Sequence, residues 1–188
     1  MHRASLLLLT LAATPLAAQG PIASSTSVTG RLSYDARATL GAFTGSTDSV
    51  IGRLDGAPTL ARVSGYVAAR AATLKTGNGL RDKDQYKSLE VDSFPFIRFD
   101  VDSVAPGATR GDTLNVVLHG AFEIHGTRRP TDLPAQLLLT PTSAHLIAST
   151  PLDVREYGIE GLVKMLGALR MNPSIVVRID VTFALGAP

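Results

Sequence analysis

The chain has 188 residues, of which 45% are hydrophobic, 5% are aromatic and 18% are charged, and it contains neither Cys nor Trp. This high apolar content with few charges excludes intrinsic disorder, and the lack of Cys excludes disulfides, thiolate metal sites and a cysteine nucleophile. The formal net charge is only +2 and basic residues are mixed with acidic ones, so nucleic acid is not an expected partner.

The first 19 residues have the features of a secretory signal peptide. Arg3 precedes an apolar run of about ten residues, and small residues then lead to a predicted cut near Ala18 or Gln19. The run is too short to cross a bilayer, which takes about twenty apolar residues. We therefore expect one mature domain over residues 20–188, periplasmic or secreted, with no transmembrane segment after signal cleavage.

From residue 31 onward, apolar and polar residues alternate with the period of two that marks a strand with one buried face. In chain order the alternation covers 31–40, 62–71, 97–102, 114–125 and 175–185, with weaker runs at 50–54, 133–139 and 144–154. Turn residues such as Asp55-Gly56 and Pro106-Gly107 separate these runs. About eight strands with short connections predict an all-β fold, an antiparallel barrel or sandwich.

Two segments depart from this alternation. The charge-rich run from Leu80 to Glu90 fits a short surface helix. From Gly158 to Met171 the apolar residues recur at helical spacing, and Pro173 prevents continuation, which predicts an amphipathic helix laid across the barrel. One or two short helices are therefore expected besides the strands.

No motif in the chain predicts catalysis or metal binding. His119, Glu123 and His125 share one face of a predicted strand, but at about 3.3 Å per residue His119 lies roughly 13 Å from Glu123, too far to share an ion. Two ligands alone make a weak site, so a solvent-facing polar row is favoured. A nucleophile elbow and a phosphate loop are also missing from the sequence. We expect no enzyme activity, cofactor or metal; a hydrolase is the least favoured reading.

The apolar face of the strands is the remaining candidate for a functional surface. Eight-stranded barrels either fill their interior with side chains or leave room for one small ligand. The inward positions here are rich in small residues: Ala36, Ala38, Gly65, Ala69, Ala71, Ala144 and Ala148. The pattern alone favours an apolar void and tight packing equally.

Several segments, spread over about residues 30–183, together resemble the YceI-like family of secreted bacterial proteins. They are Gly41-Ala42-Phe43-Thr44-Gly45, Thr73-Leu74-Lys75-Thr76-Gly77-Asn78 with Arg81-Asp82, Phe94-Pro95-Phe96-Ile97-Arg98-Phe99, residues 120–130 from Gly120-Ala121-Phe122 to Arg129-Pro130, and Glu156-Tyr157-Gly158-Ile159. The resemblance implies an extended, lipocalin-like, eight-stranded antiparallel barrel whose elongated apolar pocket holds a long-chain isoprenoid or similar amphiphile. Residues 34–37 and 88–92 depart from the family pattern, which indicates a divergent member.

We therefore expect a carrier that binds or sequesters a long-chain isoprenoid or fatty amphiphile without making or breaking a bond. Arg81, Arg128 or Arg129 would donate charge-assisted hydrogen bonds to a polar head group near the mouth. The alternative is a ligand-free extracytoplasmic barrel that acts as an interaction or stress module, and a homodimer is left open. The candidate lining residues are Leu32, Tyr34, Val67, Phe99, Phe122, Leu146, Leu162 and Leu166.

Overall fold

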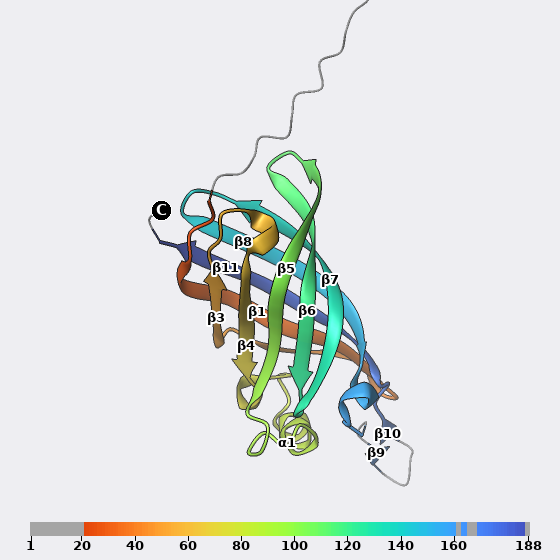
Figure 1. Ribbon diagram of the computed structural model, residues 1–188. Helices are drawn as coiled ribbons and strands as arrows, with labels where there is room; N and C mark the ends of the chain where they lie inside the picture. Colours follow the sequence, from red (N-terminus) through yellow and green to blue (C-terminus); the bar gives the residue numbers. More distant parts are fainter. Residues whose placement is uncertain (1–20, 161–162, 165–168, 187–188) are drawn as a thin grey trace, which may run out of the picture.

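The computed structural model describes residues 21–160, 163–164 and 169–186, so the predicted signal peptide lies outside the described residues. Nine strands form one antiparallel sheet in the order β2-β1-β11-β8-β7-β6-β5-β4-β3, curled into a half-barrel (Figure 1). The predicted all-β, barrel-like antiparallel fold is confirmed. The strands of this sheet are β1 (Ser25–Ala38), β2 (Gly41–Thr47), β3 (Val50–Asp55), β4 (Ser64–Arg70), β5 (Phe96–Arg110), β6 (Thr113–Ile124), β7 (Thr127–Leu139), β8 (Ser143–Asp153) and β11 (Ser174–Leu185).

Among the nine strands of this sheet, β2 is the one that the alternation does not reveal, because two of its seven residues are Gly. Only Asp48 and Ser49 separate β2 from β3, and β2 pairs with β1 while β3 pairs with β4. One stretch of chain therefore supplies both edges of the sheet. The edges are drawn together where Ile22 and Ala57 exchange two backbone hydrogen bonds of 2.8 and 2.9 Å.

The core follows the predicted period of two. On β6 the buried residues Leu114, Val116 and Leu118 alternate with less buried ones, and β7 and β8 repeat the pattern. The most deeply buried large side chains are Phe99, Leu133 and Val181, which lie on β5, β7 and β11. The apolar residues of separate strands therefore meet in one core, as sheet geometry requires.

Helix α1 (Gly79–Ser88) confirms the predicted surface helix and lies at one end of the sheet (Figure 1). It begins at Asn78, whose side-chain oxygen accepts hydrogen bonds of 3.1 Å from the backbone N–H groups of Leu80 and Arg81. This is an N-cap, which satisfies two of the free N–H groups of the first turn. Short 3₁₀ turns, η1 (Leu60–Arg62) and η2 (Ala71–Thr73), flank β4.

The second predicted helix, over Gly158–Met171, is wrong where the structure describes it. A 3₁₀ turn, η3 (Val154–Tyr157), ends at Gly158 with φ 70°, and β9 (Val163–Lys164) then pairs with β10 (Leu169–Arg170). The backbone continues to pair beyond β10: Asn172 donates to the carbonyl of Arg37 at 2.7 Å. Pairing with the end of β1 thus outweighs helical periodicity. Within the described ranges, no helix has the length and apolar character to span a membrane.

Candidate functional site

A cavity of about 440 Å³ lies in the barrel interior at the end covered by α1. Its inner wall is apolar and comes from several strands, with Leu32 on β1, Phe122 on β6 and Ile179 on β11. Leu40 and Leu80 also line it, and these side chains are 87% and 77% exposed. The cavity therefore opens to solvent between α1 and the turn that joins β1 to β2.

A second cavity of about 60 Å³ lies further into the barrel. Most of its lining residues are apolar, among them Leu54, Val104, Leu146 and Phe183, and Arg53, Ser64 and Tyr66 also border it. The interior is therefore partly open and partly packed. Some of the small residues border an apolar void, and others pack tightly. Ala38 and Ala69 line the larger cavity, Gly65 and Ala144 line the smaller one, and Ala36, Ala71 and Ala148 are buried without lining either.

Most of the residues predicted to line a pocket do line one of the two cavities, and their binding of a ligand stays a prediction. Leu162 and Leu166 lie outside the described residues. The larger cavity is lined by Leu32, Tyr34, Val67, Phe99, Phe122 and Arg81, and the smaller one by Leu146.

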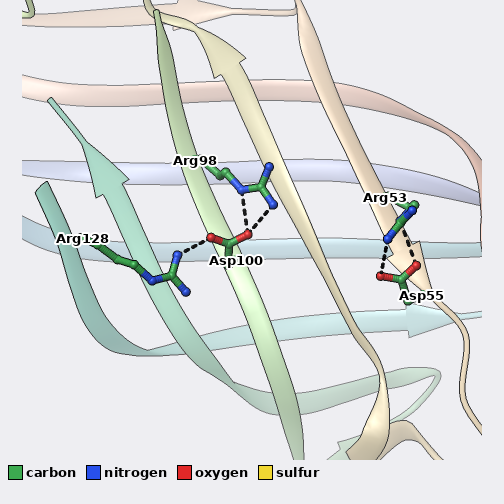
Figure 2. Close-up of polar contacts among 5 residues, drawn as sticks. All are labelled: Arg53, Asp55, Arg98, Asp100 and Arg128. Carbon is green, nitrogen blue, oxygen red and sulfur yellow. Dashed lines mark hydrogen bonds and ion pairs between the residues drawn. The ribbon is translucent and has the colours of Figure 1, made fainter. Parts of the chain in front are cut away.

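Arg128 and Arg129 are not brought to the cavity mouth, in contrast to their predicted role as head-group donors. Arg128 donates a hydrogen bond to Asp100, which also accepts one of 2.7 Å from Arg98 (Figure 2). Arg129 donates to the backbone carbonyl of Glu156 at 2.9 Å. Because Phe99 faces the core, its neighbours Arg98 and Asp100 face outward, and Arg128 joins them there.

The Asp100 cluster is a structural ion network of the outer face. Burial raises the pKa of the Asp100 carboxyl, but the hydrogen bonds from Arg98 and Arg128 outweigh it and hold this pKa below its usual value. The guanidinium of Arg98 also lies 3.8 Å from the ring centre of Tyr66. Figure 2 shows a second outer pair, Arg53 with Asp55 on β3, at 2.8 Å. The Arg128–Asp100 bond reaches from β7 across β6 to β5, and the charge-assisted hydrogen bonds commit the guanidiniums of Arg98 and Arg128 to this carboxylate.

The rim of the larger cavity is polar, and α1 supplies most of it. The phenol of Tyr34 on β1 donates a hydrogen bond to the side-chain carbonyl of Gln85, whose amide donates to the carbonyl of Leu74 at 3.4 Å. Burial raises the pKa of Tyr34, and the nearby carboxylate of Asp82 raises it further. Tyr34 therefore stays a neutral hydrogen-bond donor at the rim.

Asp82 fixes the start of α1 against the loop before it. Its carboxylate is buried and accepts hydrogen bonds from the N–H of Thr76 at 2.8 Å and from the hydroxyl of Thr76 at 2.7 Å. Burial raises the pKa of Asp82, but these hydrogen bonds and the charges of Lys75 and Arg81 outweigh it, so the pKa lies below its usual value. The carboxylate thus holds the helix in place as an anion.

Arg81 places a positive charge where the cavity meets solvent. Its guanidinium carbon lies 4.2 Å from the ring centre of Phe43 on β2, a cation–π contact that orients the side chain over the mouth. Asp84 and Glu160 also line this end of the cavity, so the rim carries both signs of charge. The site is therefore an apolar pocket with a charged and hydrogen-bonding entrance.

Sequence reasoning missed Gln85 and Phe43, because their place at the rim depends on how α1 docks on β2. Val177 and Ile179 were also missed, although the alternation on the last strand could have identified them. The described residues of the site do not form a metal centre. His119 Nδ1 lies 2.7 Å from Asp132, and among the described residues no three His, Cys, Asp or Glu side chains group closely enough to hold an ion.

Comparison with known proteins confirms the resemblance seen in the sequence. Residues 22–183 match the model of the YceI-like domain. The fold is similar to that of BcnA from Burkholderia cenocepacia, with a TM-score of 0.66 and 13% identity over 81% of this chain and 94% of that one. No protein with a curated description matches the chain in sequence.

Two further solved structures share the fold. A polyisoprenoid binding domain from Saccharophagus degradans, implicated in plant cell wall breakdown, has a TM-score of 0.66 and 13% identity over 88% of this chain and 99% of that one. The YCEI protein of Campylobacter jejuni has a TM-score of 0.58 and 14% identity over 76% of this chain and 84% of that one. At these identities the likeness is one of fold.

Proposed function

Because the chain belongs to the family defined by the YceI-like domain, we propose that it carries or sequesters a long-chain amphiphile, an isoprenoid or fatty lipid, outside the cytoplasm. The observation that carries the proposal is the apolar cavity of about 440 Å³ with a polar mouth. Its shape fits a guest with an apolar tail and a polar head. The polyisoprenoid-binding description of the Saccharophagus degradans domain, which has the same fold, supports this class of guest.

The driving force is burial of the tail. Each methylene group removed from water contributes about 0.8 kcal/mol, so a ten-carbon tail gains about 8 kcal/mol before the cost of ordering it. The wall formed by Leu32, Phe122 and Ile179 offers apolar contacts of this kind. Binding of this sort needs no catalytic group, and the guest leaves chemically unchanged.

The guest enters tail first. Polar side chains of the larger cavity gather at the α1 end, where Tyr34, Arg81 and Gln85 lie, whereas Val67 and Phe99 lie deeper. A head group at the mouth therefore finds a hydrogen-bond donor and a cation, while the tail stays among apolar side chains. The cation favours a carboxylate or phosphate head.

Delivery outside the cytoplasm rests on the predicted signal peptide of residues 1–19. We expect cleavage near Ala18 or Gln19, so that the mature protein begins at about residue 20, when the full chain is expressed in a bacterial host. N-terminal sequencing of the protein from periplasmic or culture fractions measures this. A full-length chain retained in the cytoplasm would contradict the proposed location and leave the binding proposal unaffected.

A ligand-free interaction module is the second candidate. The observation that favours it is the pair of exposed leucines, Leu40 and Leu80, which could contact a partner protein. The same leucines line the cavity mouth, which the carrier reading explains equally well. A direct search for bound lipid separates the two functions.

The test is native mass spectrometry of the gently purified full chain, followed by lipid extraction and reloading. We expect a bound mass that organic solvent removes, and a rise in melting temperature when prenyl or fatty chains are added back. Absence of both the bound mass and the thermal shift would refute the carrier function.

A matched pair of variants shows whether the guest lies inside the barrel. Ile97→Gln places an amide in the lining of the larger cavity, and Ile147→Gln makes the same change at a side chain that is 43% exposed. We expect weaker loading for Ile97→Gln only. Equal loading of the two variants would mean that the lipid binds elsewhere.

A further inference from the structure

Val67 and Phe99 separate the two cavities. They are the described residues that line both, and they lie side by side as register partners on the adjacent strands β4 and β5. Their side chains are only 4% and 1% exposed. The ring of Phe99 also packs against that of Phe122 on β6, with 4.6 Å between ring centres. These three residues form a row across three adjacent strands, and Val67 and Phe99 make the floor of the larger cavity.

On the opposite wall, one residue of β11 marks the boundary between the two cavities. On β11, Ile179 lines the larger cavity, Phe183 lines the smaller one, and Val181 between them lines neither. Val181 is fully buried, so side chains fill the space at this level. The floor thus has a counterpart across the barrel, and a packed layer divides the larger cavity from the smaller one, which we call the two chambers.

The volume of the larger chamber translates into a chain length. An apolar cavity of about 150 Å³ holds one benzene molecule, which has six carbons. By the same proportion, about 440 Å³ holds roughly eighteen carbons. A forty-carbon chain would need about 1000 Å³ on this scale, more than both chambers provide.

We infer that Val67 and Phe99 limit the guest to a single tail of about eighteen carbons, a fatty chain or a short isoprenoid. The inference rests on the proposed carrier function and narrows its ligand class. A longer chain fills the chamber, meets the floor, and leaves its remaining carbons at the mouth. Each added methylene then contributes nothing further to binding.

The experiment measures affinity against chain length for the delipidated mature protein, with saturated fatty acids of ten to twenty-four carbons as probes. For the wild type we expect affinity to rise about fourfold per methylene up to the limit and then stay flat. Farnesol, geranylgeraniol and a forty-carbon prenol give the isoprenoid series. The break in slope is the quantity compared between variants.

Phe99→Ala removes the ring that closes the floor, and the substitution thereby joins the two chambers. The chain length at which the affinity stops rising should therefore increase by several carbons. Val67→Ala, a smaller change at the same floor, should move it less. Leu133→Ala is the matched control, because Leu133 is as deeply buried as Phe99 and lines neither cavity. The control should lose stability and keep the wild-type break.

If the affinity of the wild type keeps rising through twenty-four carbons, Val67 and Phe99 do not limit the chain length. The proposed carrier function would stand. An unmoved break in folded Phe99→Ala would lead to the same conclusion. If Phe99→Ala does not fold, the wild-type series and Val67→Ala decide the question. A wild type that binds no chain of any length refutes the carrier function, and the limit with it.

Discussion

The phenol of Tyr34 on β1 donates a hydrogen bond to the side-chain carbonyl of Gln85 on α1, and both residues line the larger cavity. This contact ties the helix to the barrel wall at the entrance. Tyr86 adds a second tie, because its hydroxyl donates to the carbonyl of Leu74 at 2.7 Å. The helix is therefore a fixed part of the mouth.

Tyr34→Phe keeps the ring and removes the donor to Gln85. We expect the free energy of unfolding to fall by about 1 kcal/mol, because the Gln85 carbonyl loses its partner in a half-buried site. Urea unfolding measures the loss, and amide hydrogen exchange should rise in α1 before it rises in the strands. Tyr66→Phe, on the outer face beneath Arg98, is the control and should leave exchange in α1 unchanged.

The same substitution should change how stability depends on alkaline pH. Burial raises the pKa of Tyr34, so the folded protein keeps this proton at a pH where the unfolded chain has lost it. The resulting stability is complete below the unfolded pKa of about 10 and is lost as pH rises toward the folded-state pKa. Between about pH 9 and 11.5, the free energy of unfolding should therefore decline less steeply with pH in Tyr34→Phe than in the wild type. Identical slopes would mean that the phenol titrates normally.

Asp82→Asn tests the anchor of α1 at the opposite pH extreme. The pKa of Asp82 lies below its usual value, so its stabilising effect is present above the unfolded pKa of about 3.9 and lost as pH falls through the folded value. At pH 7 we expect the variant to lose about 1–2 kcal/mol of unfolding free energy, since the hydrogen bonds from Thr76 then go to a neutral acceptor. The difference from wild type should shrink toward pH 3; a constant difference contradicts the assignment.

Gly120 and Gly79 form a matched pair of Gly→Ala substitutions. A Cβ at Gly120 would lie 1.9 Å from the backbone carbonyl oxygen of Asp100 on the paired strand, so β5 and β6 would have to separate. We expect Gly120→Ala to lower the unfolding free energy by about 3 kcal/mol or more. Gly79 has open space around its Cβ position, so Gly79→Ala at the start of α1 should be neutral or stabilise by about 0.5–1 kcal/mol. Thermal unfolding of both variants measures the contrast.

Arg81→Gln tests the preference for an anionic head group. The variant should bind a fatty acid about tenfold less tightly, because a charge-assisted hydrogen bond contributes about 1.5 kcal/mol more than its neutral counterpart. The fatty alcohol of the same length should bind both proteins equally, and isothermal titration measures all four pairs. A parallel loss for acid and alcohol would place Arg81 in packing against Phe43 and remove it from head-group binding.

The period of two predicts strands and inward faces well, because it follows from the pleat itself. Leu114, Val116 and Leu118 are buried as the alternation predicts. It fails at β2, where Gly41 and Gly45 interrupt the pattern, and at Gly158–Met171, where helical spacing competes with backbone pairing to β1. The pattern within one segment does not show with which other segment a strand pairs.

The same limit of local patterns explains which parts of the candidate site could be predicted from the sequence. Leu32, Val67 and Phe99 are predictable as inward residues because each belongs to its own alternating run. The pairing of Arg128 with Asp100 depends on the register between β5, β6 and β7, which no single segment shows. The division of the interior into two chambers depends on where side chains from opposite walls meet, as at Val181.

Both edge strands of the sheet, β2 and β3, are capped against pairing with another copy of the chain. A sheet edge with unpaired N–H and C=O groups is a template for another copy of the chain. Here Ser46 on β2 exchanges two backbone hydrogen bonds of 2.9 Å with Lys75, and the hydroxyl of Ser25 accepts one of 2.8 Å from the N–H of Leu54 on β3. The chain thus uses a connecting segment at Lys75 and the start of β1 at Ser25 to cap the edges where strand-by-strand polymerisation would start, which suits a cysteine-free protein with no disulfide to lock them.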